Sequence, residues 1–384
     1  MAVGVFVVGM HRSGTSAIAA ALEALGLDVG APERLMAADA ANPAGYYELQ
    51  EIGDLNDEIL TALGGSWDCL PQLPDGWELG PLMTPYFRRA ASIVGTRLAK
   101  NRWLIKDPRI APLLPLWRRA VLDRCAAVVI VRDPMEVAWS LALRNGMPIL
   151  TGLALWSDYN RRTLAGLSGL PVYVSSYDEL VSAPLATMTS IRAALASWNE
   201  LSADAPVDVA AARVQPELRR NTWPRDNVDA LDVPVEIERH VKFLADLAGP
   251  HDVFEPGHPP PSPWEQAVLV ERRTGIVRLR TAATEAAMLI QQRDENARER
   301  ESLGHQLHAR NLEFEEVSEV GDRLVGLIEE LRARLAQVEA DLDVVQTRRR
   351  DAESALRRST RRLEALERSY PVRVGRALKR LLRG

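Results

Sequence analysis

Cysteine is scarce in this chain of 384 residues, which contains only Cys69 and Cys125. Two cysteines provide no disulfide framework, so we expect a reducing compartment, the cytoplasm. Metal-binding patterns are also missing, because His11 has no partner histidine or cysteine at the spacing of a metal site. We therefore expect no metal cofactor, and we expect His11 to stabilise the segment around it.

The chain also lacks a basic excess and long apolar runs. Lys and Arg number 47 and Asp and Glu 52, for a net charge of −5, which argues against nucleic-acid binding. No run of about 18 apolar residues is present, so no membrane-spanning helix is predicted. The apolar start at residues 3–8 is too short for a signal peptide, and no basic segment precedes it.

Short apolar runs alternate with helical patterns up to about residue 250. Four of these runs predict strands, at residues 3–8, 103–106, 127–131 and 172–175. The stretches between them are long enough for crossover helices, which predicts an α/β fold of three layers, α/β/α, around a parallel sheet. Residues 64–85 are rich in glycine, proline and tryptophan, and they fit either a surface loop or an irregular excursion near a ligand.

Residues 9–16 read Gly-Met-His-Arg-Ser-Gly-Thr-Ser directly after the first apolar run. The spacing is that of a phosphate-binding P-loop, GxxxxGK[ST], in which backbone N–H groups and the amino end of a helix bind an anion. Thr15 stands at the lysine position, and Arg12 lies inside the loop. Because the missing lysine would contact the β- and γ-phosphates of ATP, the loop predicts a site for a phosphate-like group without ATP hydrolysis. A helix is expected from Thr15 to Leu25, with Gly26 as its stop.

A second anion-binding pattern lies at residues 131–140, Val-Arg-Asp-Pro-Met-Glu-Val-Ala-Trp-Ser. An apolar strand is followed by Arg132, Pro134 starts a helix, and Ser140 lies eight residues after Arg132. Arginine can bind a phosphate through two parallel hydrogen bonds, and a serine two turns into the helix can donate another. Alone, the pattern also fits an ordinary strand-to-helix turn with a salt bridge. Together with the loop it predicts a second phosphate site.

With both patterns present, residues 1–245 resemble the sulfotransferases that use 3′-phosphoadenosine 5′-phosphosulfate (PAPS). In that family the loop binds the 5′-phosphosulfate, and the arginine and serine bind the 3′-phosphate. The resemblance implies that the 3′ side is held by Arg132 and Ser140, and the 5′ side by Arg12, Ser13, Gly14, Thr15 and Ser16. It also places Tyr177, in Ser-Tyr-Asp-Glu-Leu, beside the adenine, although this segment equally fits a strand-to-helix junction.

The resemblance also implies a catalytic set. Glycan-modifying members use a glutamate before an apolar residue and Gln or His, and a lysine in Lys-x-Pro; this chain has Tyr-Glu-Leu-Gln around Glu48 and Lys-Asp-Pro from Lys106. The hypothesis is that Glu48 deprotonates an acceptor hydroxyl, on a carbohydrate or glycolipid, while Arg12 and Lys106 stabilise developing negative charge. Asp107 and Glu51 are the competing bases. Glu48 also fits a helix-start carboxylate, and Lys106 a solvated strand end.

Two other functions stay open. A P-loop kinase is disfavoured by Thr15 and by the lack of an apolar strand that ends directly in an aspartate for Mg²⁺. A coiled-coil assembly protein with an inactive sulfotransferase-like domain is disfavoured by the intact pair of Arg12 and Arg132. Arg219 and Arg220 fit either a loop that closes over the 3′-phosphate or a helical surface pair.

The chain changes character after residue 249. Residues 250–263 are rich in proline and predict a stiff linker after a sulfotransferase domain at 1–249. Residues 264–369 are highly charged, with apolar residues at 3-4 spacing, which predicts one long coiled-coil helix that forms a homo-oligomer or binds a partner protein. One long helix that folds back on the domain is the alternative. Residues 370–384 carry five basic and no acidic residues, and they predict either an amphipathic tail at the inner face of a membrane or a solvated terminus.

Overall fold

The computed structural model describes residues 4–39, 42, 45–95, 102–122, 124–198, 201–202, 204–215, 233–257, 259–316 and 321–381. Side chains are described in all of these except residues 279–280, 283–284, 311–316, 321–323 and 363–381. The chain divides into two compact units, one comprising Met1–Val270 with Tyr370–Gly384 and the other Glu271–Ser369.

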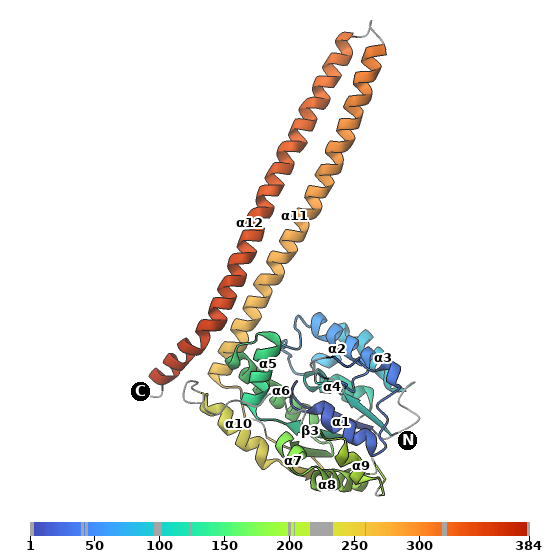
Figure 1. Cartoon of the computed structure of the whole chain (residues 1–384), viewed down its shortest axis with the longest axis vertical. Coiled ribbons are helices and arrows are strands. Elements are labelled where there is room, and N and C mark those ends of the chain that lie inside the picture. The colour runs from blue at the N-terminus through green and yellow to red at the C-terminus, as the bar shows by residue number, and fades with distance from the viewer. Residues whose placement is uncertain are drawn as a thin grey trace. The chain divides into compact units, whose positions relative to one another are not determined.

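A sheet of five strands forms the centre of the first unit (Figure 1). In the order β2-β1-β3-β4-β5, it contains β1 (Gly4–Val8), β2 (Trp103–Lys106), β3 (Cys125–Val131), β4 (Val172–Ser176) and β5 (Gly249–His251). The first four strands pair in parallel, and β5 is antiparallel to β4. The four predicted strands and their parallel pairing are confirmed. The short β5, Gly-Pro-His, was not predicted because it contains no β-branched residue.

Helices cover both faces of this sheet. Along β1, Phe6 and Val8 join one hydrophobic core, whereas Val5 and Val7 join another, as expected for side chains that alternate across a strand. The core of Phe6 includes residues of α2 (Gln50–Ala62), α3 (Thr84–Ile93), α4 (Ile110–Ala120), α5 (Pro134–Asn145), α6 (Ile149–Leu167) and α10 (Val235–Asp246). The core of Val5 includes residues of α1 (Thr15–Ala24), α7 (Tyr177–Ser182), α8 (Pro184–Ser197) and α9 (Val207–Ala212). These are the three predicted layers.

Side-chain caps start two of these helices directly behind strands. Oδ1 of Asp133, which follows β3, accepts hydrogen bonds from the N–H groups of Met135 (2.8 Å) and Glu136 (3.0 Å). Ser176, the last residue of β4, forms a capping box with Glu179 at the start of α7. The caps therefore fix the residues between strand and helix at the carboxyl edge of the sheet.

Residues 64–85 contain only short turns of 3₁₀ helix, η2 (Trp77–Leu79) and η3 (Pro81–Met83), before α3 begins. Within this segment the indole of Trp67 lies 4.7 Å from the imidazole of His11, centroid to centroid. The main-chain oxygen of Trp67 accepts a hydrogen bond from the hydroxyl of Tyr159 (2.8 Å). The segment is irregular, and its Trp67 packs beside His11 of the glycine-containing loop; a position near a ligand stays a prediction.

The proline-rich segment after residue 249 packs onto the first unit. Phe254 has no exposed surface and belongs to the core of Phe6. The helix that follows, α11 (Pro263–Glu316), places Trp264 and Leu269 in the same core. The segment is therefore held to the first unit at Phe254 and at the start of α11, and that unit extends to Val270, beyond the boundary expected at residue 249.

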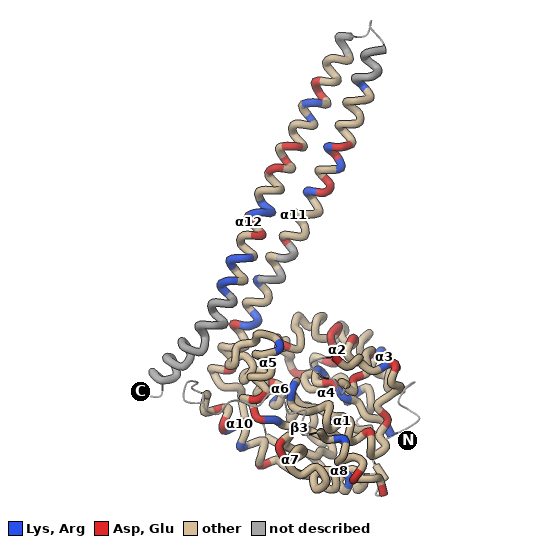
Figure 2. The backbone as a smooth tube through the Cα atoms, in the orientation of Figure 1, with Lys and Arg blue, Asp and Glu red and all other residues tan. Residues whose placement is uncertain are grey.

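The second unit contains two helices where one long helix was expected. α11 extends to Glu316, and α12 (Gly321–Leu381) runs beside it in the opposite direction (Figure 1). Charges of both signs occur along the pair (Figure 2), and Nη1 of Arg300 lies 3.8 Å from Oε1 of Glu339 across it. The single helix of the prediction is thus corrected to a helical hairpin. Self-association or partner binding through it stays a prediction.

Residues 370–381 continue α12, in line with the helix expected for the tail. Their side chains lie outside the described residues, so membrane contact through this segment stays a prediction. None of the helices described is both long enough and apolar enough to cross a bilayer.

Candidate functional site

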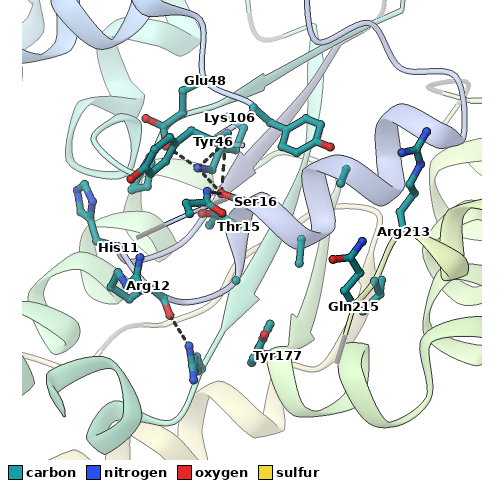
Figure 3. Close-up of a pocket in the computed structure, with 18 of the residues that line it drawn as sticks. His11, Arg12, Thr15, Ser16, Tyr46, Glu48, Lys106, Tyr177, Arg213 and Gln215 are labelled. Atoms are coloured by element: carbon teal, nitrogen blue, oxygen red, sulfur yellow. Dashed lines mark hydrogen bonds and ion pairs between the residues drawn. The ribbon is translucent and has the colours of Figure 1, made fainter. Parts of the chain in front are cut away.

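A cavity of about 460 Å³ opens at the carboxyl edge of the sheet, where ligands commonly bind in open α/β proteins (Figure 3). Residues at or just beyond the carboxyl ends of all four parallel strands reach it: the loop after β1, Lys106 at the end of β2, Arg132 after β3 and Tyr177 after β4. Its lining comprises His11, Arg12, Gly14, Thr15, Ser16, Ala17, Ala20, Asn42, Tyr46, Tyr47, Glu48, Lys106, Pro108, Arg132, Arg144, Tyr177, Arg213, Val214 and Gln215. The parallel sheet therefore brings both predicted anion-binding patterns and the predicted catalytic pair to one cavity.

The loop between β1 and α1 has the backbone of an anion-binding turn. Arg12 has φ 70° and Gly14 has φ 92°, two left-handed residues within three positions. A Cβ on Gly14 would lie 2.2 Å from the ring of Tyr177, so only glycine fits there. Gly14 is also the N-cap of α1, and because it has no side chain to cap the helix, the first N–H groups of α1 remain available to a ligand.

Arg12 and Arg132 meet at this cavity although 120 residues separate them. Nη1 of Arg132 donates to the main-chain oxygen of Arg12 (3.0 Å), and its Nε donates to Oε2 of Glu136 (2.8 Å). The Arg132 guanidinium lies over the ring of Tyr177, 4.7 Å from the centroid. Burial, followed by repulsion from Arg144 and Arg132, lowers the pKa of Arg12. Positive charge is thus concentrated where an anion would relieve it.

Two predicted binding residues do not line the cavity. Ser140 is fully buried, and its Oγ accepts a hydrogen bond from Nε of Arg12 (2.9 Å). Ser140 therefore orients the loop arginine in this structure. Ser13 is 1% exposed, and its Oγ is buried without a hydrogen-bond partner among the described residues. A buried hydroxyl with no partner carries a desolvation penalty that a ligand oxygen could offset.

Glu48 and Lys106 form a buried ion pair at the opposite end of the loop (Figure 3). Nζ of Lys106 donates to Oε1 of Glu48 (2.5 Å), the main-chain oxygen of Tyr46 (3.0 Å) and Oγ of Ser16 (3.2 Å). These contacts use all three donors of the lysine. Lys106 is 3% exposed, so it is not the solvated strand end that the sequence also allowed.

Burial and ion pairing act on Glu48 in opposite directions. The side chain is 6% exposed, and desolvation raises its pKa, while Lys106 partly offsets that rise. Neither competing carboxylate lines the cavity: Asp107 is fully buried against Arg109, and Glu51 pairs with Arg34 (3.0 Å). Of the three carboxylates considered as a base, Glu48 alone reaches the cavity. A carboxylate with a raised pKa is a better proton acceptor than an ordinary glutamate.

His11 lies in the wall of the cavity and has no partner for its Nε2 among the described residues. Burial lowers its pKa to about 3, so the imidazole is neutral at physiological pH. Within the described part of the chain, no three His, Cys, Asp or Glu side chains are placed to hold a metal ion. Arg219 and Arg220 lie outside the described residues.

The lining residues that were not predicted include Asn42, Tyr46, Arg144, Arg213 and Gln215. Arg144 follows Ser140 by one helical turn on α5, and this spacing was a signal that could have been read. Tyr46 contributes its main-chain oxygen, which no side-chain pattern reveals. Nδ2 of Asn42 donates to Oγ of Ser16 (3.1 Å) from an irregular segment. Arg213 and Gln215 follow α9, far along the chain from every motif.

The lining fits a ligand with several negative charges. Its described side chains include five that are cationic, from Arg12, Lys106, Arg132, Arg144 and Arg213, and a single carboxylate, Glu48. The uncapped amino end of α1 adds neutral N–H donors to the same wall. PAPS carries phosphate groups at both ends of an adenosine and a sulfuryl group at one of them. Charges of this kind match the donor set of the cavity.

No protein-family model matches the chain, and comparison with curated proteins gives no match. Among solved structures, the chain is similar to a sulfotransferase domain from the curacin biosynthetic pathway, with 14% identity and a TM-score of 0.34 over 71% of this chain and 97% of that chain. A similarity at this level does not identify a reaction, so the proposal below rests on the cavity and on the sequence patterns that line it.

Proposed function

We propose that the chain is a PAPS-dependent sulfotransferase that transfers a sulfuryl group to a hydroxyl of a carbohydrate or glycolipid. The observation that carries the proposal is the convergence of Arg12, Arg132 and the amino end of α1 on one cavity that also contains the buried Glu48. Anion-binding groups and a basic carboxylate in one cavity are the two components that transfer of an anionic group to a hydroxyl requires.

Donor binding is assigned to two groups of residues. The N–H groups at the start of α1, with Ser13, Thr15 and Ser16, would hold the 5′ side of PAPS. Arg132 would hold the 3′-phosphate after exchanging part of its bonding to Glu136, and the ring of Tyr177 would contact the adenine. Bound there, PAPS would supply an activated sulfuryl group.

Catalysis is assigned to three side chains. Glu48 accepts the proton of the acceptor hydroxyl on a carboxylate oxygen, which its raised pKa favours. Lys106 keeps that carboxylate in place, and it also contacts Ser16 of the loop, so it links the base to the donor site. The acceptor oxygen would bond to sulfur as the bond from sulfur to the bridging oxygen of the donor breaks, and 3′-phosphoadenosine 5′-phosphate would leave with that oxygen. Arg12, held by Ser140, would stabilise the negative charge that develops at the transferred group.

The carbohydrate acceptor rests on the resemblance of the Glu48 and Lys106 segments to those of glycan-modifying sulfotransferases. Tyr46 and Asn42 line the same cavity as Glu48, and their polar side chains support a polyol as the acceptor. A P-loop kinase is less well supported, since Thr15 replaces the lysine and the aspartate nearest a strand end, Asp107, is held by Arg109 away from the cavity.

Calorimetric titration with 3′-phosphoadenosine 5′-phosphate, and separately with ATP, tests the proposal. We expect micromolar or tighter binding of the first ligand that does not change when Mg²⁺ is chelated. Arg132→Gln should weaken this binding at least tenfold, whereas Arg34→Gln, outside the cavity, should leave it unchanged. Mg²⁺-dependent binding of ATP would instead support a kinase, and binding of neither ligand would support an assembly protein.

Transfer itself is tested with ³⁵S-labelled PAPS and pools of glycans, lipids and peptides. We expect label in the glycan or glycolipid pool and its loss in the Arg132→Gln variant. Label confined to the peptide pool would overturn the carbohydrate assignment while leaving the sulfotransferase assignment intact.

A further inference from the structure

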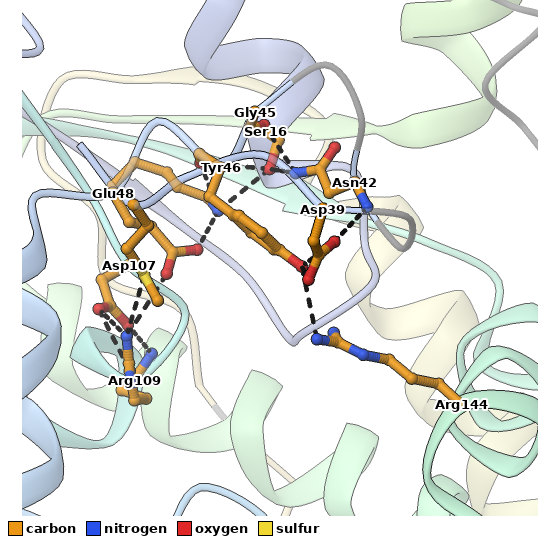
Figure 4. A network of polar contacts seen from close by, with 11 residues as sticks. Ser16, Asp39, Asn42, Gly45, Tyr46, Glu48, Asp107, Arg109 and Arg144 are labelled. Atoms are coloured by element: carbon orange, nitrogen blue, oxygen red, sulfur yellow. Dashed lines mark hydrogen bonds and ion pairs between the residues drawn. The ribbon is translucent and has the colours of Figure 1, made fainter. Parts of the chain in front are cut away.

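Arg109 lies behind Glu48 in a buried cluster of charges that donor binding does not require (Figure 4). Its Nη2 donates to Oε2 of Glu48 (3.4 Å) and to Oδ2 of Asp107 (2.7 Å). Its Nη1 donates to Oδ2 of Asp57 on α2 (2.6 Å). Arg109 is 8% exposed and does not line the cavity, so it reaches a ligand only through Glu48.

The helix facing this cluster has a glycine where the guanidinium passes. Gly53 lies inside α2, and a Cβ built on it would come 2.7 Å from Nη2 of Arg109. Glycine within a helix is unfavourable relative to alanine, because it loses more conformational freedom on folding. Here its missing side chain provides the space that the arginine occupies. The position of Arg109 is therefore supported by a second feature of the chain, independent of its ion pairs.

Asp107 holds Arg109 more firmly than Glu48 does. It accepts from the main-chain N–H of Arg109 (2.8 Å), from Nε (2.9 Å) and from Nη2 (2.7 Å), whereas the contact with Glu48 is a single one of 3.4 Å. Burial alone would raise the pKa of Asp107, but the charge and hydrogen bonds of Arg109 bring it below its ordinary value. Asp107 therefore remains charged and neutralises much of the arginine.

We propose that Arg109 is a positioning residue for Glu48: it fixes the orientation of the carboxylate, while Asp107 and Asp57 offset its charge so that the carboxylate stays basic. This inference rests on the proposed function of Glu48. Without the two aspartates, Glu48 would lie between two uncompensated cations, Lys106 and Arg109, and would be a poor base. Without Arg109, the side chain of Glu48 would be held on one side only.

A role in folding alone makes a different prediction. Ion pairs inside a protein can be purely structural, and in that case changes in the cluster would alter stability without a patterned effect on Glu48. If Arg109 positions Glu48 and the aspartates compensate its charge, then removing the arginine and removing an aspartate should shift the pKa of Glu48 in opposite directions. Arg109 lowers the pKa of Glu48 and Asp107 raises it.

The groups around Glu48 come from several elements. Lys106 belongs to β2, Asp107 and Arg109 lie between β2 and α4, and Asp57 lies on α2. His11, from the loop after β1, is buried and neutral, since its pKa is about 3. It therefore contributes no charge to the titration of Glu48 at neutral pH.

The experiment is a ¹³C NMR titration of glutamate carboxyl groups in the full chain, with the Glu48 signal assigned by its loss in Glu48→Gln. We expect the Glu48 pKa to rise in Arg109→Met, to fall in Asp107→Asn, and to fall less in Asp57→Asn, whose side chain is 53% exposed in the native chain. Arg34→Met, which removes an ion pair with Glu51, is the matched control: it should leave the Glu48 pKa unchanged, and any shift should be confined to Glu51. Unchanged pKa values in these variants, or shifts of one sign in all of them, overturn the proposal.

Kinetics supply the second readout. Arg109→Met should lower kcat about tenfold to a hundredfold and move the acid limb of the pH profile upward, with the affinity for 3′-phosphoadenosine 5′-phosphate within twofold of the native value. Arg109→Lys, which keeps the charge but not the forked geometry, should recover part of kcat. If Arg109→Met does not fold, Asp57→Asn and Arg109→Lys carry the test, and native kcat and pH profile in both would overturn the proposal. A native chain that transfers no sulfuryl group would refute the proposed function. The NMR titration would still show whether Arg109 and the two aspartates shift the pKa of Glu48 in opposite directions.

Discussion

Glu48 shows how a single side chain balances opposing electrostatic effects. Desolvation raises its pKa, and Lys106 and Arg109 lower it, with a net rise. A carboxylate this buried is tolerated because both oxygens have cationic partners, one on each side. The same pairing leaves one face of the carboxylate in the cavity wall, where a hydroxyl group can approach.

Glu48→Gln tests the catalytic assignment. We expect turnover to fall by about 10²–10⁴, the usual contribution of a general base, with native affinity for 3′-phosphoadenosine 5′-phosphate. Stability should fall by about 1–3 kcal/mol, because Lys106 keeps an oxygen partner but loses the opposite charge. In the native chain the acid limb of the rate profile should lie above the pH at which an ordinary glutamate titrates, since the pKa of Glu48 is raised. Glu51→Gln is the control, and near-native turnover of Glu48→Gln would refute the assignment.

His11 gives a prediction for stability against pH. Burial lowers its pKa from 6.5 to about 3, so between these values the unfolded chain binds a proton that the folded chain does not. The contribution of His11 to the free energy of unfolding is therefore complete above pH 6.5 and is lost as the pH falls toward 3. Over this range the free energy of unfolding falls by about 1.4 kcal/mol per pH unit for one proton. His240, with a pKa lowered by burial to about 4, acts in the same direction.

His11→Gln should therefore reduce, but not abolish, the loss of stability on acidification. The measurement is chemical denaturation at several pH values between 4 and 6.5, the window in which the folded and unfolded states of His11 differ. In the double variant with His240→Gln, the free energy of unfolding should change even less with pH. An unchanged slope in His11→Gln would show that the imidazole is accessible to protons in the folded chain.

At the scale of elements, the amino end of α1 depends on a glycine that serves two purposes. Gly14 adopts φ 92°, and its missing side chain leaves room for the ring of Tyr177. The turn therefore both directs N–H groups at the cavity and brings the end of β4 close to the loop. Gly26, at the other end of α1, also has positive φ, at 100°, but a Cβ there would meet nothing within 4 Å.

These two glycines form a matched pair for mutation. Gly26→Ala should cost about 1–2 kcal/mol from backbone strain alone and leave ligand affinity unchanged. Gly14→Ala should cost more, because the methyl group also displaces Tyr177, and it should weaken binding of 3′-phosphoadenosine 5′-phosphate at least tenfold. Thermal melts measure the loss of stability in each variant, and calorimetric titration measures the affinity for 3′-phosphoadenosine 5′-phosphate. Equal effects of the two variants on affinity would show that the turn at Gly14 has no special part in binding.

The same elements show what the sequence could reveal. Apolar runs and glycine spacing identified the four parallel strands and the loop, and parallel order then placed Arg12, Lys106 and Arg132 at one edge. The antiparallel β5 carried no pattern, because its pairing depends on β4 and not on its own composition. Ser140 matched the spacing of a phosphate-binding motif, yet in the structure its hydroxyl accepts a hydrogen bond from Arg12. A motif gives the position of a side chain in the sequence and does not determine which group the side chain contacts.

At the scale of the whole chain, the charged C-terminal region contains two helices where one was predicted, and the reason is physical. A 3-4 repeat shows that a helix buries one seam, but it does not show whether the covering helix belongs to the same chain. In the structure, α11 and α12 cover each other within the second unit. The seam of α12 is buried or half-buried at Leu324, Ile328, Leu331, Leu335, Val338, Leu342, Val345, Arg349, Ala352, Leu356 and Ser359.

Pairing of α11 with α12 inside one chain favours a monomer over the self-association that the repeat first predicted, and the mass of the purified chain decides between the two. Once α11 covers the seam, the remaining surface of α12 is mostly exposed and charged, and ion pairs there contribute little: Arg300 and Glu339, at 3.8 Å, are both about half exposed. We expect light scattering to give a mass near 42.5 kDa at micromolar concentration. Twice that mass would mean that the helices pair between two copies, as the self-association first expected from the repeat requires.

Two neighbouring residues of α12 test whether the seam holds the hairpin together. Val345 is 4% exposed in the seam, whereas Val344 is 49% exposed beside it. Val345→Asp places an unpaired carboxylate in an apolar contact and should destabilise the second unit by about 2–5 kcal/mol. Val344→Asp adds the same charge in water and should cost less than about 0.5 kcal/mol. The helical circular dichroism signal, followed on heating, distinguishes the two variants, because the hairpin should melt at a lower temperature only in Val345→Asp. Equal melting temperatures would mean that the seam does not stabilise the pair of helices.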